Sequence, residues 1–186
     1  MHEMTKYLIF IPNLLSIVRI ALVYPILNNI YLGNFKISVV FFLVASLTDA
    51  LDGFLARKMN WQTDLGRILD PVADKLLLSG TIFILWLNNF IPFYIFIIFI
   101  TRDAAILTGA AIQMSIIESD TPAPNLLGKL TTSLQIIYIS MIFLNEIFEL
   151  NLEFNFLDIL IIFVTVLSLC VYAFNWYKDL RKYHNE

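Results

Sequence analysis

The feature that most limits the fold of this chain is a series of apolar stretches, each long enough to cross a lipid bilayer as a helix. A spanning helix needs about 20 mostly apolar residues. Six stretches meet this requirement if polar interruptions are allowed, namely Ile9–Tyr31, Phe35–Arg57, Ile68–Leu87, Pro92–Met114, Leu126–Leu144 and Phe156–Tyr177. We therefore predict an all-α fold, an integral membrane bundle of six transmembrane helices, in which residues 1–186 form a single domain.

The composition excludes most other classes of protein. Hydrophobic residues make up 59% of the 186 residues and charged residues only 15%. This hydrophobic fraction is larger than a water-soluble domain of this length needs to form its core. The net charge is -3 and the chain has no long basic run, so we expect membrane lipids as its surroundings and no nucleic acid as a partner.

Lysine and arginine residues are distributed unevenly among the predicted loops. If the N-terminus faces the cytoplasm, the outer loops contain only Lys36. The inner loops and tails then contain Lys6, Arg57, Lys58, Arg67, Lys129, Lys178, Arg181 and Lys182. Because cytoplasmic loops are enriched in lysine and arginine, we predict that both termini face the cytoplasm.

Four aspartates interrupt the apolar chain within one segment, DALDGFLARKMNWQTDLGRILDPVAD. Asp49 and Asp52 come near the end of the second predicted span, and Asp70 and Asp74 come near the start of the third. Their spacings of three and four place each pair on one helical face. One aspartate at a helix centre costs about 2.5–3.5 kcal/mol, so four would cost on the order of 10 kcal/mol. Two divalent cations, Mg²⁺ or Mn²⁺, would offset this cost because carboxylate oxygens are suitable ligands for them.

Small residues and one arginine are interleaved with the aspartates. Gly53 and Gly66 each lie one turn from an aspartate, and Ala56 extends the small face, so an extended ligand could approach the backbone there. Arg57 offers a planar fork that suits phosphate oxygens. Metal ions together with an arginine indicate a substrate that bears phosphate. The other interpretation is that the aspartates are juxtamembrane charges paired with basic neighbours, which are Lys58, Arg67 and Lys75.

The spacing D-x2-D-G-x2-A-R-x8-G-x3-D-x3-D resembles the signature of the CDP-alcohol phosphotransferase family, and every fixed position is present. Three further stretches, IPNLLSIVRI, ITRDAAIL and GKLTTSLQ, are similar to the phosphatidylglycerophosphate synthases and cardiolipin synthases of this family. The resemblance implies six transmembrane helices, a homodimer, and a cavity open to the cytoplasm in which a di-metal site holds a CDP-linked lipid.

The same resemblance implies roles for individual residues. It implies a general base at Asp74 and two metal ions. The implied metal ligands are Asp49, Asp52, Asp70 and Asp74, and the implied CDP-lipid-binding residues are Gly53, Ala56, Arg57 and Gly66.

One face of the first predicted span is polar. Asn13, Ser16 and Arg19 share this face because they are spaced by three residues. The resemblance places this stretch beside the active site. Among the three, we expect Arg19 to be the residue that binds the phosphate of an acceptor.

The fourth and fifth predicted spans supply two more candidates for an acceptor-phosphate site. Arg102 lies about halfway along its span beside Asp103, and the two residues either form a structural ion pair or take part in the site. Lys129 either closes the same pocket or follows the general bias for positive charge on the cytoplasmic side. Phosphatidylglycerophosphate synthases typically have Arg-Glu here and a second arginine two turns later, where this chain has Gly109.

We predict a membrane enzyme that transfers a phosphatidyl group from CDP-diacylglycerol to glycerol 3-phosphate, releasing CMP by direct, metal-assisted attack of the acceptor hydroxyl. It would be a multi-pass protein of a bacterial cytoplasmic membrane, with its active site facing the cytoplasm. The alternatives are a cardiolipin synthase that uses phosphatidylglycerol, and a small divalent-cation transporter. Arg57 argues against transport, because a fixed cation repels the ion that must pass.

Overall fold

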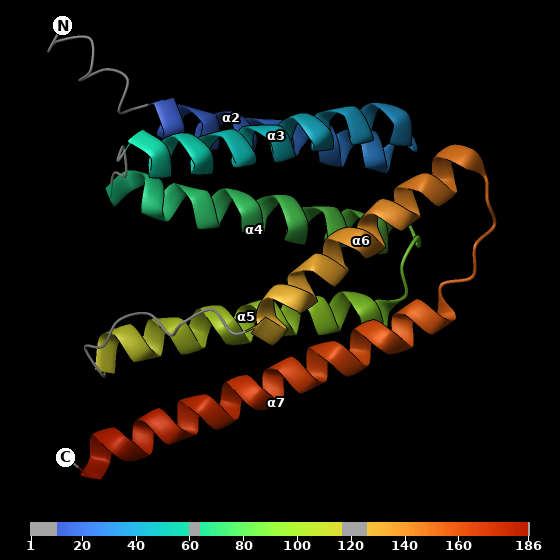
Figure 1. Ribbon diagram of the computed structural model, residues 1–186. Coiled ribbons are helices and arrows are strands. Elements are labelled where there is room, and N and C mark those ends of the chain that lie inside the picture. Colours follow the sequence, from blue (N-terminus) through green and yellow to red (C-terminus); the bar gives the residue numbers. More distant parts are fainter. Residues whose placement is uncertain (1–10, 60–63, 117–125, 186) are drawn as a thin grey trace, which may run out of the picture. The chain divides into compact units, whose positions relative to one another are not determined.

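The computed structural model describes residues 11–59, 64–116 and 126–185, and these ranges contain helices and no strand. The helices are α2 (Ile11–Tyr31), α3 (Phe35–Met59), α4 (Asp64–Leu87), α5 (Phe93–Ile116), α6 (Leu126–Phe148) and α7 (Asn155–Asn185) (Figure 1). The all-α prediction is confirmed. Each helix corresponds to one predicted span, with differences of a few residues at most ends, whereas α7 continues well past Tyr177.

Three helical segments within the described residues are long and apolar enough to cross a membrane. They are Asn13–Tyr31, Leu127–Phe148 and Asn155–Lys178. Large apolar side chains, including Tyr24, Phe156 and Phe163, are exposed on the helices. Such extensive apolar exposure is unfavourable in water and suits contact with lipid, so the fold is that of a membrane protein.

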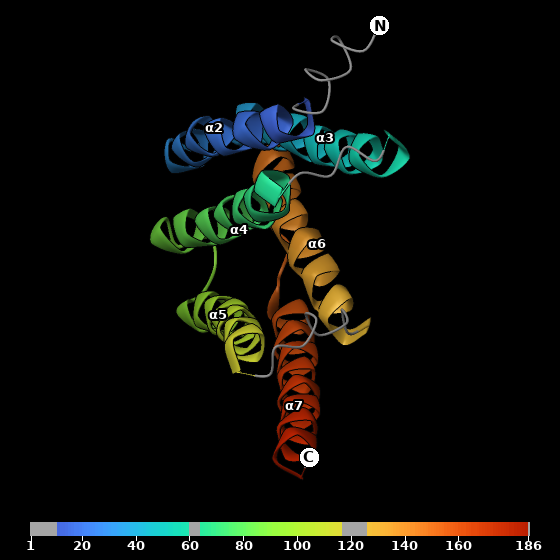
Figure 2. The same ribbon diagram turned by 90° about the vertical axis from the view of Figure 1, so that its left-hand side faces the viewer.

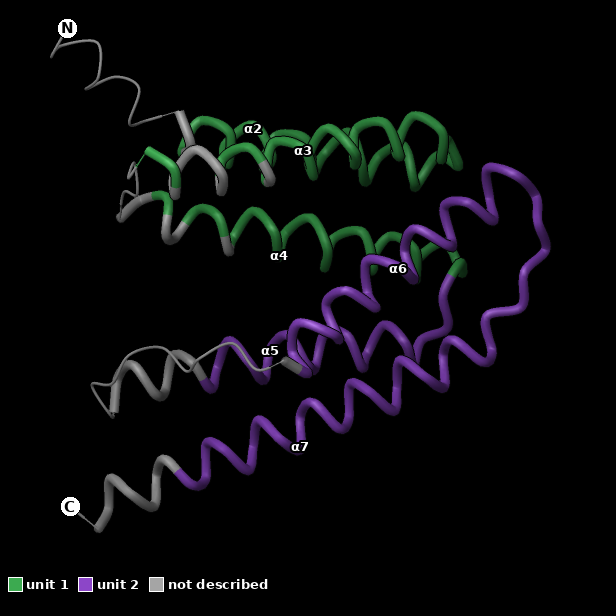
Figure 3. Tube along the Cα trace, in the orientation of Figure 1, with its two compact units in different colours: residues 1–90 green, residues 91–186 purple. Residues whose placement is uncertain are grey.

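The helices form two compact units, Met1–Phe90 and Ile91–Glu186 (Figure 3). In the first unit, α2 packs against both α3 and α4, and Figure 2 shows α2 beside α3 with α4 next to them. In the second unit, α7 packs against both α5 and α6. Each unit is therefore built around one helix that both of the others contact.

Contacts at the helix ends of the first unit fix the ends of α2 and α4 beside each other. Gly33 ends α2 with φ 74°, and its N–H donates to the carbonyl oxygen of Ile30 at 3.0 Å. Asn89 ends α4 in the same left-handed conformation, with φ 61°, and glycine and asparagine are the residues that adopt it most readily at helix ends. The Asn88 side chain donates to the carbonyl oxygens of Ile30 and Tyr31 at 3.4 and 3.3 Å. These contacts hold the end of α4 against the end of α2.

Candidate active site

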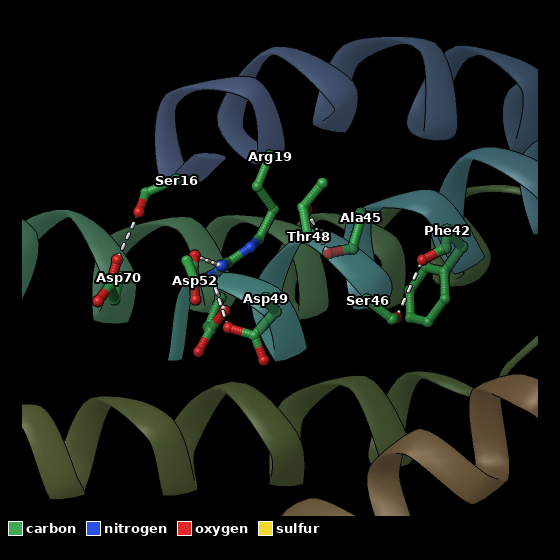
Figure 4. Close-up of polar contacts among 10 residues, drawn as sticks. Ser16, Arg19, Phe42, Ala45, Ser46, Thr48, Asp49, Asp52 and Asp70 are labelled. Carbon is green, nitrogen blue, oxygen red and sulfur yellow. Dashed lines mark hydrogen bonds and ion pairs between the residues drawn. The ribbon is translucent and has the colours of Figure 1, made fainter. Parts of the chain in front are cut away.

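The four aspartates of the sequence signature lie together at the other end of the first unit. Asp49 and Asp52 come from the last turns of α3, and Asp70 and Asp74 come from the first turns of α4. Between these pairs lie side chains from the first turns of α2, the helix against which both α3 and α4 pack (Figure 4). The predicted meeting of the two carboxylate pairs is therefore present, and α2 mediates it.

Arg19 of α2 is the centre of this carboxylate cluster. Its Nη1 lies 2.9 Å from Oδ1 of Asp49 and donates to Oδ1 of Asp74 at 2.6 Å. Its Nη2 donates to Oδ2 of Asp52. One guanidinium thus forms ion pairs with three carboxylates from two helices, a geometry for which the planar fork of arginine is well suited.

Ser16 provides a second link from α2. Its hydroxyl donates to Oδ1 of Asp70 at 2.5 Å, so each of the four signature aspartates has a contact with α2. The side chains of Asn13, Ser16 and Arg19 are all buried, which confirms that these residues share an inward face. Sequence reasoning placed Ser16 on this face but did not assign it a contact with an aspartate.

Exposure separates the carboxylates into two kinds. The side chains of Asp49 and Asp74 are 51% and 47% exposed, whereas the side chain of Asp52 is 3% exposed. Arg19 is fully buried. The cluster therefore has an inner side, where α2 holds it, and an outer side, where Asp49 and Asp74 can meet a ligand.

The chemistry of the cluster fits hard divalent cations, because its donors are carboxylate oxygens. Four carboxylates against one guanidinium leave an excess of three negative charges among these five side chains. In the part of the chain that the structure describes, these oxygens are not grouped around a single point as in a metal site. Instead they are directed at two guanidinium nitrogens and one hydroxyl. The ligand type and the charge fit a metal site, with the outer oxygens as the candidate ligands.

The predicted CDP-lipid-binding residues lie on the same two helices. Gly66 is buried in the first turn of α4. Gly53, Ala56 and Arg57 belong to the last turns of α3, but their side chains lie outside the described residues. These four assignments stay predictions.

Arg102 and Asp103, in the second unit, form an ion pair on α5. Nη1 of Arg102 donates to Oδ1 of Asp103 at 2.7 Å, and both side chains are buried. Nη2 donates to the carbonyl oxygen of Gly128 at 2.8 Å and lies 3.3 Å from the hydroxyl oxygen of Thr132. Lys129 follows Gly128 directly and is exposed. Arg102 thus reaches the start of α6, where the other predicted acceptor residue of this unit lies.

Sequence reasoning missed one polar cluster of the second unit. Asp158, in the first turn of α7, is buried and accepts hydrogen bonds from the hydroxyls of Tyr138 at 2.7 Å and Tyr94 at 2.8 Å. These tyrosines come from α6 and α5, so the cluster links all three helices of the unit. An aspartate inside an apolar run such as FLDILIIFV was the available signal, because intramembrane charges nearly always have partners.

These features define a class of protein, namely an apolar helical membrane protein that holds a carboxylate cluster of excess negative charge. The family model for CDP-alcohol phosphatidyltransferase matches residues 9–174. The chain therefore belongs to this family, which confirms the resemblance of its signature.

Named relatives agree with the family assignment. The chain is 35% identical over 178 residues to the CDP-diacylglycerol--glycerol-3-phosphate 3-phosphatidyltransferase of Bacillus subtilis, covering 85% of this chain and 90% of the relative. It is 34% identical over 180 residues to the protein of the same name from Aquifex aeolicus, covering 92% and 98%. It is also 41% identical over 101 residues to the CMP-forming cardiolipin synthase of Rattus norvegicus, covering 53% and 33%.

Proposed function

We propose that this chain is an enzyme that transfers a phosphatidyl group from CDP-diacylglycerol to glycerol 3-phosphate, giving phosphatidylglycerophosphate and CMP. The observation that carries the proposal is the gathering of four signature aspartates from α3 and α4 at one end of the first unit, with an excess of negative charge. Relatives whose names state this reaction align with most of the chain.

The carboxylate cluster would hold two divalent cations, Mg²⁺ or Mn²⁺. The proposed ligands are Asp49, Asp52, Asp70 and Asp74. When bound, such cations would neutralise the pyrophosphate of the CDP-lipid and the charge that develops on its oxygens. Without cations, a cluster this acidic would repel that pyrophosphate.

Asp74 is the proposed general base. Its side chain is 47% exposed, so an acceptor hydroxyl can reach it, whereas the 3% exposure of Asp52 leaves little room for a substrate. Asp74 would take the proton as the acceptor oxygen forms a bond to the phosphorus on the lipid side of the pyrophosphate. The bond from that phosphorus to the bridging oxygen breaks, and CMP leaves with the electron pair. No covalent enzyme intermediate is required.

The cytidine diphosphate group would lie along the small residues of the signature. Gly53, Ala56 and Gly66 would allow it to approach the helix backbones closely. Arg57 would hold phosphate oxygens through its planar fork. Substitution of Arg57 by alanine should therefore weaken binding of CDP-diacylglycerol more than it lowers turnover.

The acceptor phosphate would be bound by basic residues, for which Arg19, Arg102 and Lys129 are the candidates. Arg102 and Lys129 are supported by their proximity, since Arg102 contacts the carbonyl oxygen of Gly128 and Lys129 is the next residue. Arg19 makes its described ion pairs with carboxylates, and its direct contact with the acceptor stays a prediction.

Several expectations about the assembled protein belong to the same proposal. All six helices would cross the membrane, with both termini and the active site on the cytoplasmic side. The protein would reside in a bacterial cytoplasmic membrane and form a homodimer. Labelling of single introduced cysteines from either side of the membrane would test the topology, and cross-linking in the membrane would test the dimer.

The decisive experiment is an acceptor assay. Purified protein is incubated with CDP-diacylglycerol, Mg²⁺ and either glycerol 3-phosphate or phosphatidylglycerol, and both CMP and the lipid product are measured. We expect CMP and phosphatidylglycerophosphate with glycerol 3-phosphate. Absence of CMP with every alcohol, together with uptake of divalent cations into vesicles, would instead favour a transporter.

A second candidate function, cardiolipin synthesis, is favoured by the surroundings of Arg102. Nη1 of Arg102 donates a hydrogen bond to the adjacent Asp103, and Nη2 donates one to the carbonyl oxygen of Gly128. The Tyr172 phenol lies against Gly109, where a larger side chain would collide with it, so this position offers no second cation for a phosphomonoester. Cardiolipin formed from phosphatidylglycerol, with no product from glycerol 3-phosphate, would establish this alternative.

A further inference from the structure

Arg19 connects two helices that carry separate halves of the carboxylate cluster. Asp49 and Asp52 lie on α3, Asp74 lies on α4, and Arg19 lies on α2, the helix against which both pack. A single nitrogen, Nη1, contacts Oδ1 of Asp49 and Oδ1 of Asp74. This one side chain therefore links the two aspartate pairs directly.

The contacts from α2 use one oxygen of each carboxylate. Arg19 contacts Oδ1 of Asp49, Oδ2 of Asp52 and Oδ1 of Asp74, and Ser16 contacts Oδ1 of Asp70. In Figure 4, one oxygen of Asp49 points toward Arg19 and the other points away from it. For the half-exposed Asp49 and Asp74, the oxygen that Arg19 does not contact can therefore meet a ligand.

Burial distinguishes the two sides in the same way. Arg19 and Ser16 are fully buried, whereas Asp49 and Asp74 are about half exposed. A ligand that arrives from outside would therefore meet the carboxylates before it could meet Arg19. The guanidinium also reduces the repulsion between carboxylates that would otherwise be close without a counter-charge.

We propose that Arg19, assisted by Ser16, is a positioning residue that holds the inner oxygens of the carboxylates so that their outer oxygens can bind divalent cations. In this role Arg19 touches neither the cations nor the substrates, which leaves Arg102 and Lys129 as the candidates for the acceptor phosphate. This inference rests on the proposed function in one respect, because the divalent cations are the ones that the phosphatidyl transfer would use. Hydrogen bonds of this kind behind ligating carboxylates are commonly worth 10- to 100-fold in metal affinity.

Two other roles for Arg19 predict different results. If its guanidinium occupied the place of a metal ion, removing it would tighten metal binding. If it only bound the acceptor phosphate, removing it would leave metal binding unchanged in the absence of acceptor. Metal affinity measured without any substrate therefore separates the three roles.

The test is a titration of purified, substrate-free protein with Mn²⁺, in which electron paramagnetic resonance measures the free ion. We expect Arg19→Gln to raise the Kd for Mn²⁺ by about 10- to 100-fold. Arg19→Lys should raise it by a smaller factor, because an ammonium keeps the charge but lacks the fork that reaches Asp49, Asp52 and Asp74 together. An unchanged or lower Kd in Arg19→Gln would overturn the proposal.

Arg102→Gln is the matched control, since it removes the same group from a buried site that contains one carboxylate. Its Kd for Mn²⁺ should equal that of the wild type. If Arg19→Gln does not fold, Arg19→Lys and Ser16→Ala decide the matter. A raised Kd in both supports the positioning role, and a wild-type Kd in either variant overturns it.

The outcome is separable from that of the proposed function. Wild-type protein that binds Mn²⁺ but releases no CMP with any acceptor would contradict the phosphatidyl transfer and leave the positioning role intact. Wild-type protein that releases CMP, together with normal Mn²⁺ binding in Arg19→Gln, would contradict the positioning role alone. Wild-type protein that does not bind Mn²⁺ would contradict both.

Discussion

Each of the two units buries an arginine, but the charge around the two arginines differs. Arg19, in the first unit, forms ion pairs with Asp49, Asp52 and Asp74. Arg102, in the second unit, forms an ion pair with Asp103 and completes its contacts with a backbone carbonyl. The first arrangement has an excess of negative charge, whereas the second is locally neutral.

A further buried carboxylate among the described residues of the second unit also differs from those of the first. Asp158 accepts hydrogen bonds from two tyrosine hydroxyls, and these join α5 and α6 to α7. A buried charge whose polar partners come from the surrounding helices can serve stability alone. In the part of the first unit that the structure describes, four carboxylates surround one guanidinium, an arrangement that is costly unless further cations bind.

A ligand site and a structural ion pair can both contain buried charges. They differ in whether the negative charges of the carboxylates outnumber the positive charges beside them. Both units contain buried ionisable groups in apolar helices. Among the described residues, the cluster around Arg19 gathers four carboxylates around one guanidinium, whereas the single carboxylate of Asp158 accepts hydrogen bonds from two tyrosine hydroxyls.

Removal of divalent cations should have the largest effect, because the first unit then retains its excess of negative charge. We expect excess chelator to abolish CMP release from CDP-diacylglycerol, and added Mg²⁺ or Mn²⁺ to restore it. The measurement is CMP formation at increasing chelator concentration. Undiminished CMP release in metal-depleted protein would show that the excess charge has another purpose.

Asp74→Asn should lower kcat by about 10²- to 10⁴-fold, the usual contribution of a general base. Binding of CDP-diacylglycerol should change much less, because the other three aspartates can still hold cations. Asp158→Asn is the matched control in the second unit, and folded protein of this variant should keep near-normal turnover. Near-native kcat in Asp74→Asn would require another base.

Arg102→Ala tests whether the neutral pair of the second unit also has a functional role. We expect it to raise KM for glycerol 3-phosphate, or lower kcat, by at least about tenfold, which corresponds to about 1.4 kcal/mol from a charge-assisted phosphate contact. Kinetics at varied glycerol 3-phosphate and saturating CDP-diacylglycerol would measure this. Unchanged constants would identify the Arg102–Asp103 pair as purely structural.

Tyr138→Phe should have the smallest effect on catalysis and a measurable effect on stability. It removes the 2.7 Å hydrogen bond to Asp158, and such bonds in membrane proteins contribute about 0.6 kcal/mol on average and at most about 1.7 kcal/mol. Reversible unfolding in detergent would give the change in the free energy of unfolding. A large loss of kcat without a loss of stability would mean that Asp158 belongs to the reaction.

The sequence was sufficient to predict the helices and the carboxylate cluster, for identifiable reasons. Long apolar runs determine helices because backbone groups in lipid must be hydrogen-bonded within the chain. The spacings of Asp49 with Asp52 and of Asp70 with Asp74 determine that each pair shares a face. Since α4 begins only five residues after α3 ends, the two pairs were expected to lie at a similar depth.

The partners of these charges could not be predicted in the same way. Asp158 was missed because its donors, Tyr94 and Tyr138, lie 64 and 20 residues away in the chain. Arg19 was expected at a phosphate, and its position among three aspartates depends on the packing of α2 against both neighbouring helices. The spacing of residues along one helix shows which of them share a face. It does not show which side chains of another helix that face contacts.

The sequence by itself determined an all-helical membrane protein, its family and the four carboxylates at one end of two helices. These follow from local patterns, namely apolar length, helical periodicity and the signature spacing. Only the tertiary structure decided that α2 inserts Arg19 and Ser16 on the inner side of the cluster, with Asp49 and Asp74 left half exposed. The physical reason is that helix packing depends on the shapes of whole faces, so a contact between residues 19 and 74 is specified by many side chains together.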